Sequence, residues 1–168
     1  MRKIVKLPNS ALRQKSTQVK TINSKIKKLA QEMVDYMNQH QADHLSPIGL
    51  AAPQLGELVR VIAFRRNPNS NDNADIQVLI NPTLVKAKDF HVVIESCLSV
   101  PDKVFRLRRA KKVKIRGLTL DNVERSFRGH DLLAQVFQHE LDHLDGVLID
   151  QIGEVERYSR YQVTERQK

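Results

Sequence analysis

The sequence has one cysteine, Cys97, no tryptophan and no apolar run long enough to span a bilayer. A single cysteine cannot form an intramolecular disulfide, and a lone thiol suits a reducing compartment better than an oxidising one. The basic N-terminal stretch also lacks the continuous apolar segment of a signal peptide. These absences predict a soluble, cytoplasmic protein that does not bind membranes. The length of 168 residues predicts one compact domain over residues 1–168.

Acidic residues are absent from residues 2–28 and from residues 103–120, and the formal net charge of the chain is +9. Basic segments of this kind attract anionic partners. They form either solvated surfaces that keep the protein soluble or a docking surface for RNA. Because aromatic side chains make up 5% of the sequence, contact with backbone phosphates is favoured over base stacking. No DNA partner is expected.

The periodicity of apolar residues predicts two helices. Residues 24–40 carry apolar side chains at three- and four-residue intervals, which is typical of an amphipathic helix, and Asn23 or Ser24 can cap its first turn. Residues 131–144 have the same helical pattern, and Gly146 is placed to end that helix.

The segments between these helices predict short, mainly antiparallel strands around the second helix, which makes the expected fold class α+β. The predicted strands are residues 58–64, 76–81, 83–85, 91–95 and 113–120, with a hairpin turn at Asp121-Asn122. The other predicted segments are an extended or irregular start (1–19), an ordered loop (46–56), a surface loop (66–75) and a tail (154–166) that is either helical or frayed.

The strongest local signal is His139-Glu140-Leu141-Asp142-His143, an H-E-x-x-H pattern inside the second predicted helix. The helical period places both imidazoles one turn apart on one face, so that they can share a metal ion. Glu140 is placed to act on a water bound to that ion as general acid and base, rather than as a ligand. The apolar residues that flank the pattern argue against two freely solvated histidines. The pattern therefore predicts a metal-dependent hydrolase.

A catalytic site of this type uses three protein ligands and leaves a fourth position for water. Cys97 is the better candidate for the third ligand, because it ends an apolar strand and a thiolate binds zinc or ferrous iron strongly. Glu154 or Glu156 is the alternative, which would make the chain a zincin-type metallopeptidase. A third interpretation is a basic RNA- or ribosome-binding module that keeps an inactive relic of the site.

Three segments together resemble, in this order, the motifs of the peptide deformylases. They are Gly49-Leu50-Ala51-Ala52-Pro53-Gln54, Glu95-Ser96-Cys97-Leu98-Ser99 and Gln138-His139-Glu140-Leu141-Asp142-His143. Residues 8–16 and 144–148 are similar to the family's N-terminal segment and to its helix exit. The resemblance covers nearly the whole chain.

The resemblance implies an enzyme that removes the N-formyl group from the initiator methionine of nascent chains and releases formate. It implies Cys97, His139 and His143 as ligands of one divalent ion, which is Fe²⁺ in the cell, with Zn²⁺, Ni²⁺ or Co²⁺ able to bind the same site. The implied compartment is the bacterial cytoplasm, or the stroma or matrix of an organelle. The implied partners are formylmethionyl nascent peptides and, through the basic segments, ribosomal RNA.

The resemblance also implies how the reaction is helped. Glu140 takes a proton from the attacking water and later protonates the leaving amine. The side-chain amide of Gln54 and the backbone N–H of Leu98 donate hydrogen bonds to the tetrahedral oxyanion.

The substrate's methionine side chain requires an apolar pocket. Helix geometry nominates Val136 and Leu132, about one and two turns before His139. Ile48 would close the pocket from the predicted loop. Gly49 is expected close to the substrate backbone, where a side chain would obstruct it.

The chain departs from the family pattern at Pro47 and Ser96, where glycine is common, and at Val104, where a basic residue is frequent. Proline fixes φ and lacks an N–H, and serine adds a Cβ and a hydroxyl. A narrower or differently shaped substrate channel is therefore expected. Val104 predicts weaker binding of the substrate peptide.

Overall fold

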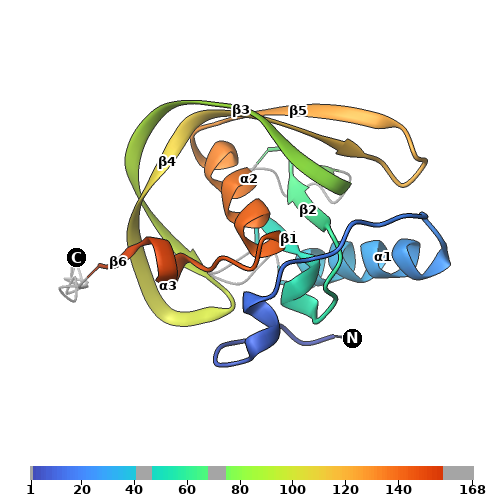
Figure 1. The fold of residues 1–168 in the computed structure, drawn as a ribbon, viewed down its shortest axis with the longest axis horizontal. Coiled ribbons are helices and arrows are strands. Elements are labelled where there is room, and N and C mark those ends of the chain that lie inside the picture. The colour runs from blue at the N-terminus through green and yellow to red at the C-terminus, as the bar shows by residue number, and fades with distance from the viewer. Residues whose placement is uncertain (1, 41–46, 68–74, 157–168) are drawn as a thin grey trace, which may run out of the picture.

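The computed structural model describes residues 2–40, 47–67 and 75–156, in which antiparallel strands combine with two long helices (Figure 1). The predicted α+β class is confirmed. The α-helices are α1 (Ser24–Gln39), α2 (Asp131–Leu144) and α3 (Ile149–Ile152), and the 3₁₀ helices are η1 (Ser10–Arg13) and η2 (Ala52–Leu55). The strands are β1 (Gly49–Ala51), β2 (Val61–Arg65), β3 (Ile76–Cys97), β4 (Val100–Leu118), β5 (Glu124–His130) and β6 (Glu154–Val155).

One sheet contains the six described strands in the order β1-β2-β3-β4-β5, with β6 paired to β4, and every pair is antiparallel. β3 and β4 form a long hairpin joined by a two-residue turn at Leu98 and Ser99. This hairpin curves around α2 (Figure 1). The curvature brings the end of β3 close to the middle of α2, although the two segments are more than 40 residues apart.

The prediction of short strands is wrong for β3. This strand has 22 residues and contains the three segments predicted at 76–81, 83–85 and 91–95. Shifts of register between Ile80 and Thr83 and between Leu84 and Lys86 bend the strand without ending it, as β-bulges do.

β4 has 19 residues and begins at Val100, much earlier than the predicted start at residue 113. The basic first half of this strand hides an alternation in which Phe105, Leu107 and Arg109 point inward and are buried. Because Arg109 is charged yet buried, the sequence of this half of β4 has the pattern of a solvated basic segment and not of a strand. The hairpin turn predicted after β4 is present, and Asn122 N–H donates to the carbonyl oxygen of Thr119 there at 3.0 Å.

The other predicted elements differ at their ends. α1 begins and is capped as expected, since the side chain of Asn23 accepts from Ile26 N–H at 3.1 Å. β2 begins at Val61, three residues after the predicted start. The predicted loop at 46–56 instead contains β1 and η2. Most of the loop predicted at 66–75 and of the tail predicted at 154–166 lies outside the described residues.

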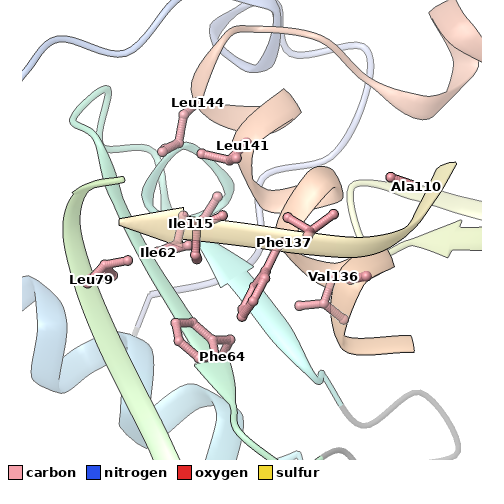
Figure 2. Close-up of a cluster of buried hydrophobic side chains, with 12 residues drawn as sticks. Ile62, Phe64, Leu79, Ala110, Ile115, Val136, Phe137, Leu141 and Leu144 are labelled. Carbon is pink, nitrogen blue, oxygen red and sulfur yellow. The ribbon is translucent and has the colours of Figure 1, made fainter. Parts of the chain in front are cut away.

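β2 is buried on both faces because a helix covers each of them. Ile62 and Phe64 point toward α2, where the ring of Phe64 meets the ring of Phe137 edge-on at 4.9 Å (Figure 2). Val61 and Ala63 belong to the cluster formed by the apolar face of α1. Full burial of a side chain of this size contributes about 1.5–3 kcal/mol. These contacts fix the position of α2 relative to β1 and β2.

No helix in the described ranges is both long enough and apolar enough to cross a membrane.

Gly56 and Gly146 allow a matched test of the chain's path, because both have positive φ, at 82° and 73°. A Cβ on Gly146 would lie 2.7 Å from the carbonyl oxygen of Arg13, whereas the nearest atom to a Cβ on Gly56 is Val5 Cγ2 at 3.7 Å. Gly56→Ala is expected to lower the free energy of unfolding by about 1–2 kcal/mol, the cost of a left-handed backbone. Gly146→Ala should cost clearly more. Urea denaturation measures both variants, and equal losses would contradict the close approach of Arg13 to Gly146.

Candidate metal centre

α2 presents two histidines to the same space. His139 and His143 are one turn apart, and their ring centroids are 4.8 Å from each other with planes at 80°. The helix is held in this position by its opposite, apolar face, which includes the fully buried Phe137 and Leu144.

Cys97, the last residue of β3, completes a group of three donors. Its Sγ lies 3.3 Å from His143 Nε2, and the ligand atoms of Cys97, His139 and His143 all lie within 4.8 Å of one another. Tetrahedral Zn–S and Zn–N bonds of about 2.3 Å and 2.0–2.1 Å place ligand atoms about 3.3–3.6 Å apart. The three side chains therefore fit one ion of this kind after a small closing movement.

The two histidines differ in their protonation. Burial lowers the pKa of His143 well below its usual value, so its ring is neutral and offers a lone pair. Burial also acts to lower the pKa of His139, but contacts with Cys97 and Glu95 outweigh it and hold this pKa well above the usual value.

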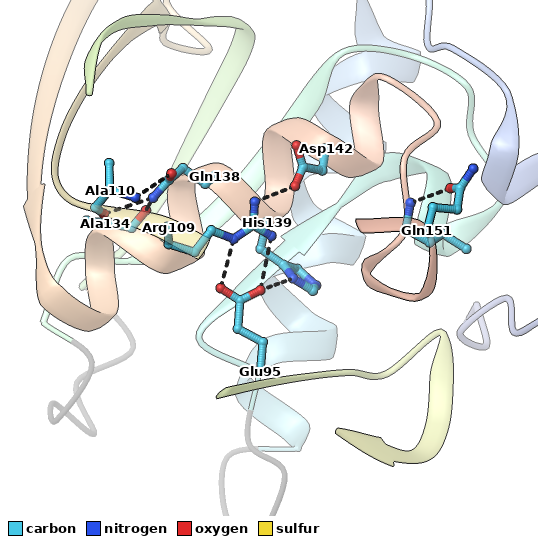
Figure 3. A network of polar contacts seen from close by, with 9 residues as sticks. Glu95, Arg109, Ala110, Ala134, Gln138, His139, Asp142 and Gln151 are labelled. Carbon is cyan, nitrogen blue, oxygen red and sulfur yellow. Dashed lines mark hydrogen bonds and ion pairs between the residues drawn. The ribbon is translucent and has the colours of Figure 1, made fainter. Parts of the chain in front are cut away.

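A buried polar network positions His139 (Figure 3). Glu95 Oε2 contacts His139 Nδ1 at 3.2 Å, which leaves Nε2 for the metal. Arg109 donates to both oxygens of Glu95 at 3.0 Å and to Asp142 Oδ2 at 2.6 Å. The network links β3, β4 and α2, and it fixes the ring of His139, one of the three candidate donors, from behind.

Gln138 fixes the helix to β4 directly before His139. Its Oε1 accepts from Ala110 N–H at 2.9 Å, and its Nε2 donates to the carbonyl oxygens of Ala110 at 3.0 Å and Ala134 at 2.9 Å (Figure 3). The amide thus pairs with Ala110 as the backbone of a neighbouring strand would. These bonds satisfy the backbone N–H and carbonyl groups of Ala110, which lies between the part of β4 that pairs with β5 and the part that pairs with β6.

Glu140 is 3% exposed, and burial raises the pKa of its carboxyl to about 7. Its Oε2 has no hydrogen-bond partner within the described residues. A Cβ on Gly49 would lie 2.5 Å from Glu140 Oε1 and 2.6 Å from Val136 Cγ1, so the missing side chain of Gly49 makes room for the carboxyl. A buried group with a pKa near neutrality is suited to exchanging protons.

Gln54 is buried beside the cysteine. Its Oε1 accepts from Ala51 N–H at 2.9 Å, while its Nε2 lies 3.9 Å from Cys97 Sγ and 3.4 Å from Ser99 Oγ. The amide N–H₂ is therefore directed toward the donor group. Leu98 is the first residue of the turn that follows Cys97.

Three of the four predicted pocket residues lie together in the structure. Val136 is buried next to Gly49, and Ile48 packs against the same apolar cluster as Val136. Leu132 is 44% exposed and lies outside that cluster. Its place in a substrate pocket stays a prediction.

The departures from the family pattern lie mostly away from the donors. Ser96 is exposed between two inward-pointing residues, Glu95 and Cys97, so its side chain points to the outer face of the sheet. Val104 pairs with Ser96 in the strand register. This geometry does not support a narrowing of the channel by Ser96. Pro47 is buried.

The alternative third ligands are not near the site. Glu154 is exposed on β6, and Glu156 accepts from Arg106 at 2.7 and 3.0 Å on the surface. The one group of potential ligands found among the described residues is Cys97, His139 and His143.

Three supporting residues, Glu95, Arg109 and Gln138, were not predicted as site residues. A signal for Glu95 was available, because it precedes Cys97 by two positions and so shares its face of the strand. Arg109 could have been found from the alternation with Phe105 and Leu107. The pairing of Gln138 with Ala110 had no local signal, since it depends on how the helix sits on the sheet.

Comparisons with known proteins agree with this arrangement. The sequence profile of a family described as polypeptide deformylase matches residues 1–163. A peptide deformylase of Syntrophomonas wolfei is 41% identical over 145 residues, which are 86% of this chain and 88% of that protein. A peptide deformylase of Thermodesulfovibrio yellowstonii is 37% identical over 155 residues, 92% of this chain and 90% of the relative.

Solved structures are similar over most of their length. The crystal structure of a peptide deformylase from Legionella pneumophila matches with a TM-score of 0.81 and 31% identity, over 90% of this chain and 85% of that one. The peptide deformylase structure from Thermotoga maritima matches with a TM-score of 0.78 and 29% identity, over 90% and 97% of the two chains.

Glu95→Gln tests whether the network positions His139. The variant keeps the shape of the side chain but removes the negative charge behind the ring, so metal affinity is expected to fall about 10–100-fold. Competition with a chromophoric chelator for Zn²⁺ or Co²⁺ measures the change. Glu156→Gln is the control, because it removes a carboxylate that pairs with Arg106 on the surface. Equal affinities of the two variants would show that Glu95 does not support the ligand.

Proposed function

We propose, because this chain belongs to the polypeptide deformylase family, that Cys97, His139 and His143 hold one divalent metal ion and that Glu140 handles the proton. The chain is a hydrolase that removes the formyl group from nascent peptides. The observation that carries the site assignment is the buried carboxyl of Glu140 beside three converging donors. The metallopeptidase and relic interpretations have no comparable support.

A divalent ion in this group would polarise the formyl carbonyl and lower the pKa of an adjacent water. We propose Fe²⁺ as the native ion, with Zn²⁺, Ni²⁺ and Co²⁺ as substitutes, since one thiolate and two imidazoles suit all of them. The free thiol and the absence of a second cysteine support a reducing compartment such as the cytoplasm.

Glu140 moves the proton between the two halves of the reaction. Its carboxylate accepts a proton as water adds to the formyl carbon, and the resulting carboxylic acid donates that proton to the amine nitrogen as the C–N bond breaks. The products are formate and a free N-terminal amine. The pKa of about 7 that burial gives this carboxyl suits both directions of transfer near neutral pH.

Gln54 and Leu98 are proposed to stabilise the oxyanion that forms at the formyl oxygen. The amide of Gln54 is pre-oriented, because its oxygen is occupied by Ala51 N–H while its nitrogen faces the donor group. The backbone N–H of Leu98 follows Cys97 directly. Fixed donors of this type cost no reorganisation during the reaction.

The methionine side chain of the substrate is proposed to bind beside Val136 and Ile48, with Leu132 at the exposed end of the pocket. Gly49 lets the substrate backbone approach Glu140, since a side chain there would collide with both Glu140 and Val136. The proposed substrate is thus an N-formylmethionyl nascent peptide. Ribosomal RNA is proposed as a second partner that binds the basic segments of the chain.

Formate release from a formyl-Met-Ala-Ser peptide tests the function. Anaerobically prepared wild-type protein with one metal per chain is expected to release formate, and Glu140→Gln is expected to lose about 10²–10⁴-fold in kcat because it cannot transfer the proton. Metal content should be unchanged in the variant. Glu154→Gln, which alters an exposed carboxylate on β6, is the matched control. Retained turnover in Glu140→Gln would refute the role of this residue.

Metal content tests the ligand set separately. Cys97→Ala removes one of three donors and is expected to abolish stoichiometric binding of metal, whereas Glu156→Ala should retain it. Elemental analysis of both purified variants gives the ratio of metal to protein. Loss of metal in Glu156→Ala with retention in Cys97→Ala would favour the zincin arrangement instead.

A further inference from the structure

Cations lie directly opposite one another across three strands of the sheet. The register pairs β3 with β4 and β4 with β5 so that two adjacent rows are basic. One row is Lys86, Lys114 and Arg128, and the next is Lys88, Lys112 and His130. We call these six residues the basic face. Like charges directly opposite each other destabilise an antiparallel pair, so sheet stability does not explain this arrangement.

The basic face points away from the catalytic site. The residues that alternate with it, Ala87 on β3, Val113 on β4 and Phe127 on β5, pack against the apolar cluster around α2. The side chains of the basic face are therefore on the solvent side of β3, β4 and β5. Figure 1 shows this part of the sheet arching over α2. A ligand on this face would leave the metal centre open.

Few carboxylates neutralise these cations. Asp89 pairs with Lys112 at 2.7 Å. In the described parts of the chain, no ion pair is formed by Lys86, Lys88, Lys114 or Arg128. The row of Lys86, Lys114 and Arg128, called the central row below, therefore keeps its full positive charge, although the backbone holds its three cations next to each other.

The spacing of the cations suits a polymer of phosphates. Side chains on one face of a strand recur about 7 Å apart along the strand and lie about 5 Å apart across paired strands. The row of three cations and the adjacent row with two cations therefore form a small grid in which neighbouring phosphates of one nucleic acid strand can each meet a cation. A monovalent anion would use one or two of these positions and leave the rest repelling each other.

Beyond the basic face, the outer side of β3 carries exposed apolar residues. Phe90 is 54% exposed, and the guanidinium of Arg108 lies over its ring at 5.9 Å. Val92 and Ile94 are also exposed on β3 next to Phe90. An aromatic ring beside an arginine offers a stacking position for one base at the end of the phosphate grid.

We propose that the basic face binds the sugar–phosphate backbone of RNA. This inference rests on the proposed function in one respect, because a nascent peptide is close to RNA while it is still being synthesised. An anionic membrane is the weaker occupant, since membrane-surface binding needs apolar side chains among the cations, and the exposed apolar residues of β3 flank the two rows without belonging to them. Binding through phosphates is sequence-independent and strongly dependent on salt.

The test compares two variants that each lose three positive charges. Lys86→Gln with Lys114→Gln and Arg128→Gln removes the central row. Lys20→Gln with Lys27→Gln and Lys28→Gln removes three exposed cations near the start of α1 and serves as the control. The probe is a fluorescein-labelled 20-nucleotide poly(U) RNA, and anisotropy gives its affinity for the full-length, metal-loaded protein at several salt concentrations.

The central-row variant is expected to bind the RNA at least about tenfold more weakly, and the slope of log affinity against log salt should shrink by about 2, as for the loss of three phosphate contacts to a single strand. The control variant should bind nearly as well as the wild type. Equal weakening in both variants would overturn the proposal in favour of net charge alone. Unchanged RNA binding with a loss of binding to phosphatidylglycerol vesicles would overturn it in favour of a membrane.

Formate release from the short formylated peptide separates this inference from the proposed function. Both triple variants should keep wild-type turnover. The basic face lies on the other side of the sheet from Glu140, and the three control lysines are exposed near the start of α1. RNA binding that depends on the central row would stand even if the wild-type protein released no formate. A wild-type protein that releases formate but binds the RNA no better than the central-row variant would refute the inference and leave the deformylase function in place.

Discussion

The buried carboxylate of Glu95 is the constraint on which the site depends. Burial alone would raise the pKa of Glu95, but His139 and Arg109 outweigh that effect and hold this pKa below its usual value. A buried charge of this kind is tolerated only while its partners stay in place, because losing one leaves an uncompensated ion. The partners come from α2 and β4, and Glu95 itself comes from β3. The network therefore makes the orientation of His139 conditional on the packing of three elements.

The surroundings of Glu140 depend on a second close contact, in which β1 passes next to α2 at Gly49. β2 lies between two apolar clusters, and this packing sets the distance at which β1 passes the helix. Gly49 then leaves room for the carboxyl of Glu140 and for Val136, while the surrounding apolar groups exclude water from the carboxyl. Desolvation is the largest cause of the raised pKa of Glu140. The same packing that stabilises the fold thus prepares an acid that ionises near neutral pH.

The sequence was sufficient to predict that Cys97, His139 and His143 lie together as candidate ligands, because helical spacing relates the two histidines and the motif around Cys97 is specific. It was also sufficient for both long helices and for the fold class. The lengths of β3 and β4 could not be predicted, since bulges and a buried Arg109 interrupt the apolar alternation on which a strand prediction relies. The pairing of Gln138 with Ala110 and the grid of cations across three strands are properties of register, which no single segment encodes.

The turn after Cys97 couples the metal centre to the folding of the longest hairpin. Successive side chains of a strand point to opposite faces, so a slip of one residue between β3 and β4 would move Cys97 to the outer face and Ser96 to the inner one. The same slip would separate Glu95 from Arg109. A chain whose hairpin is misaligned would therefore present two histidines without a thiolate. Only the observed register of the hairpin would therefore offer a metal ion all three donors at once.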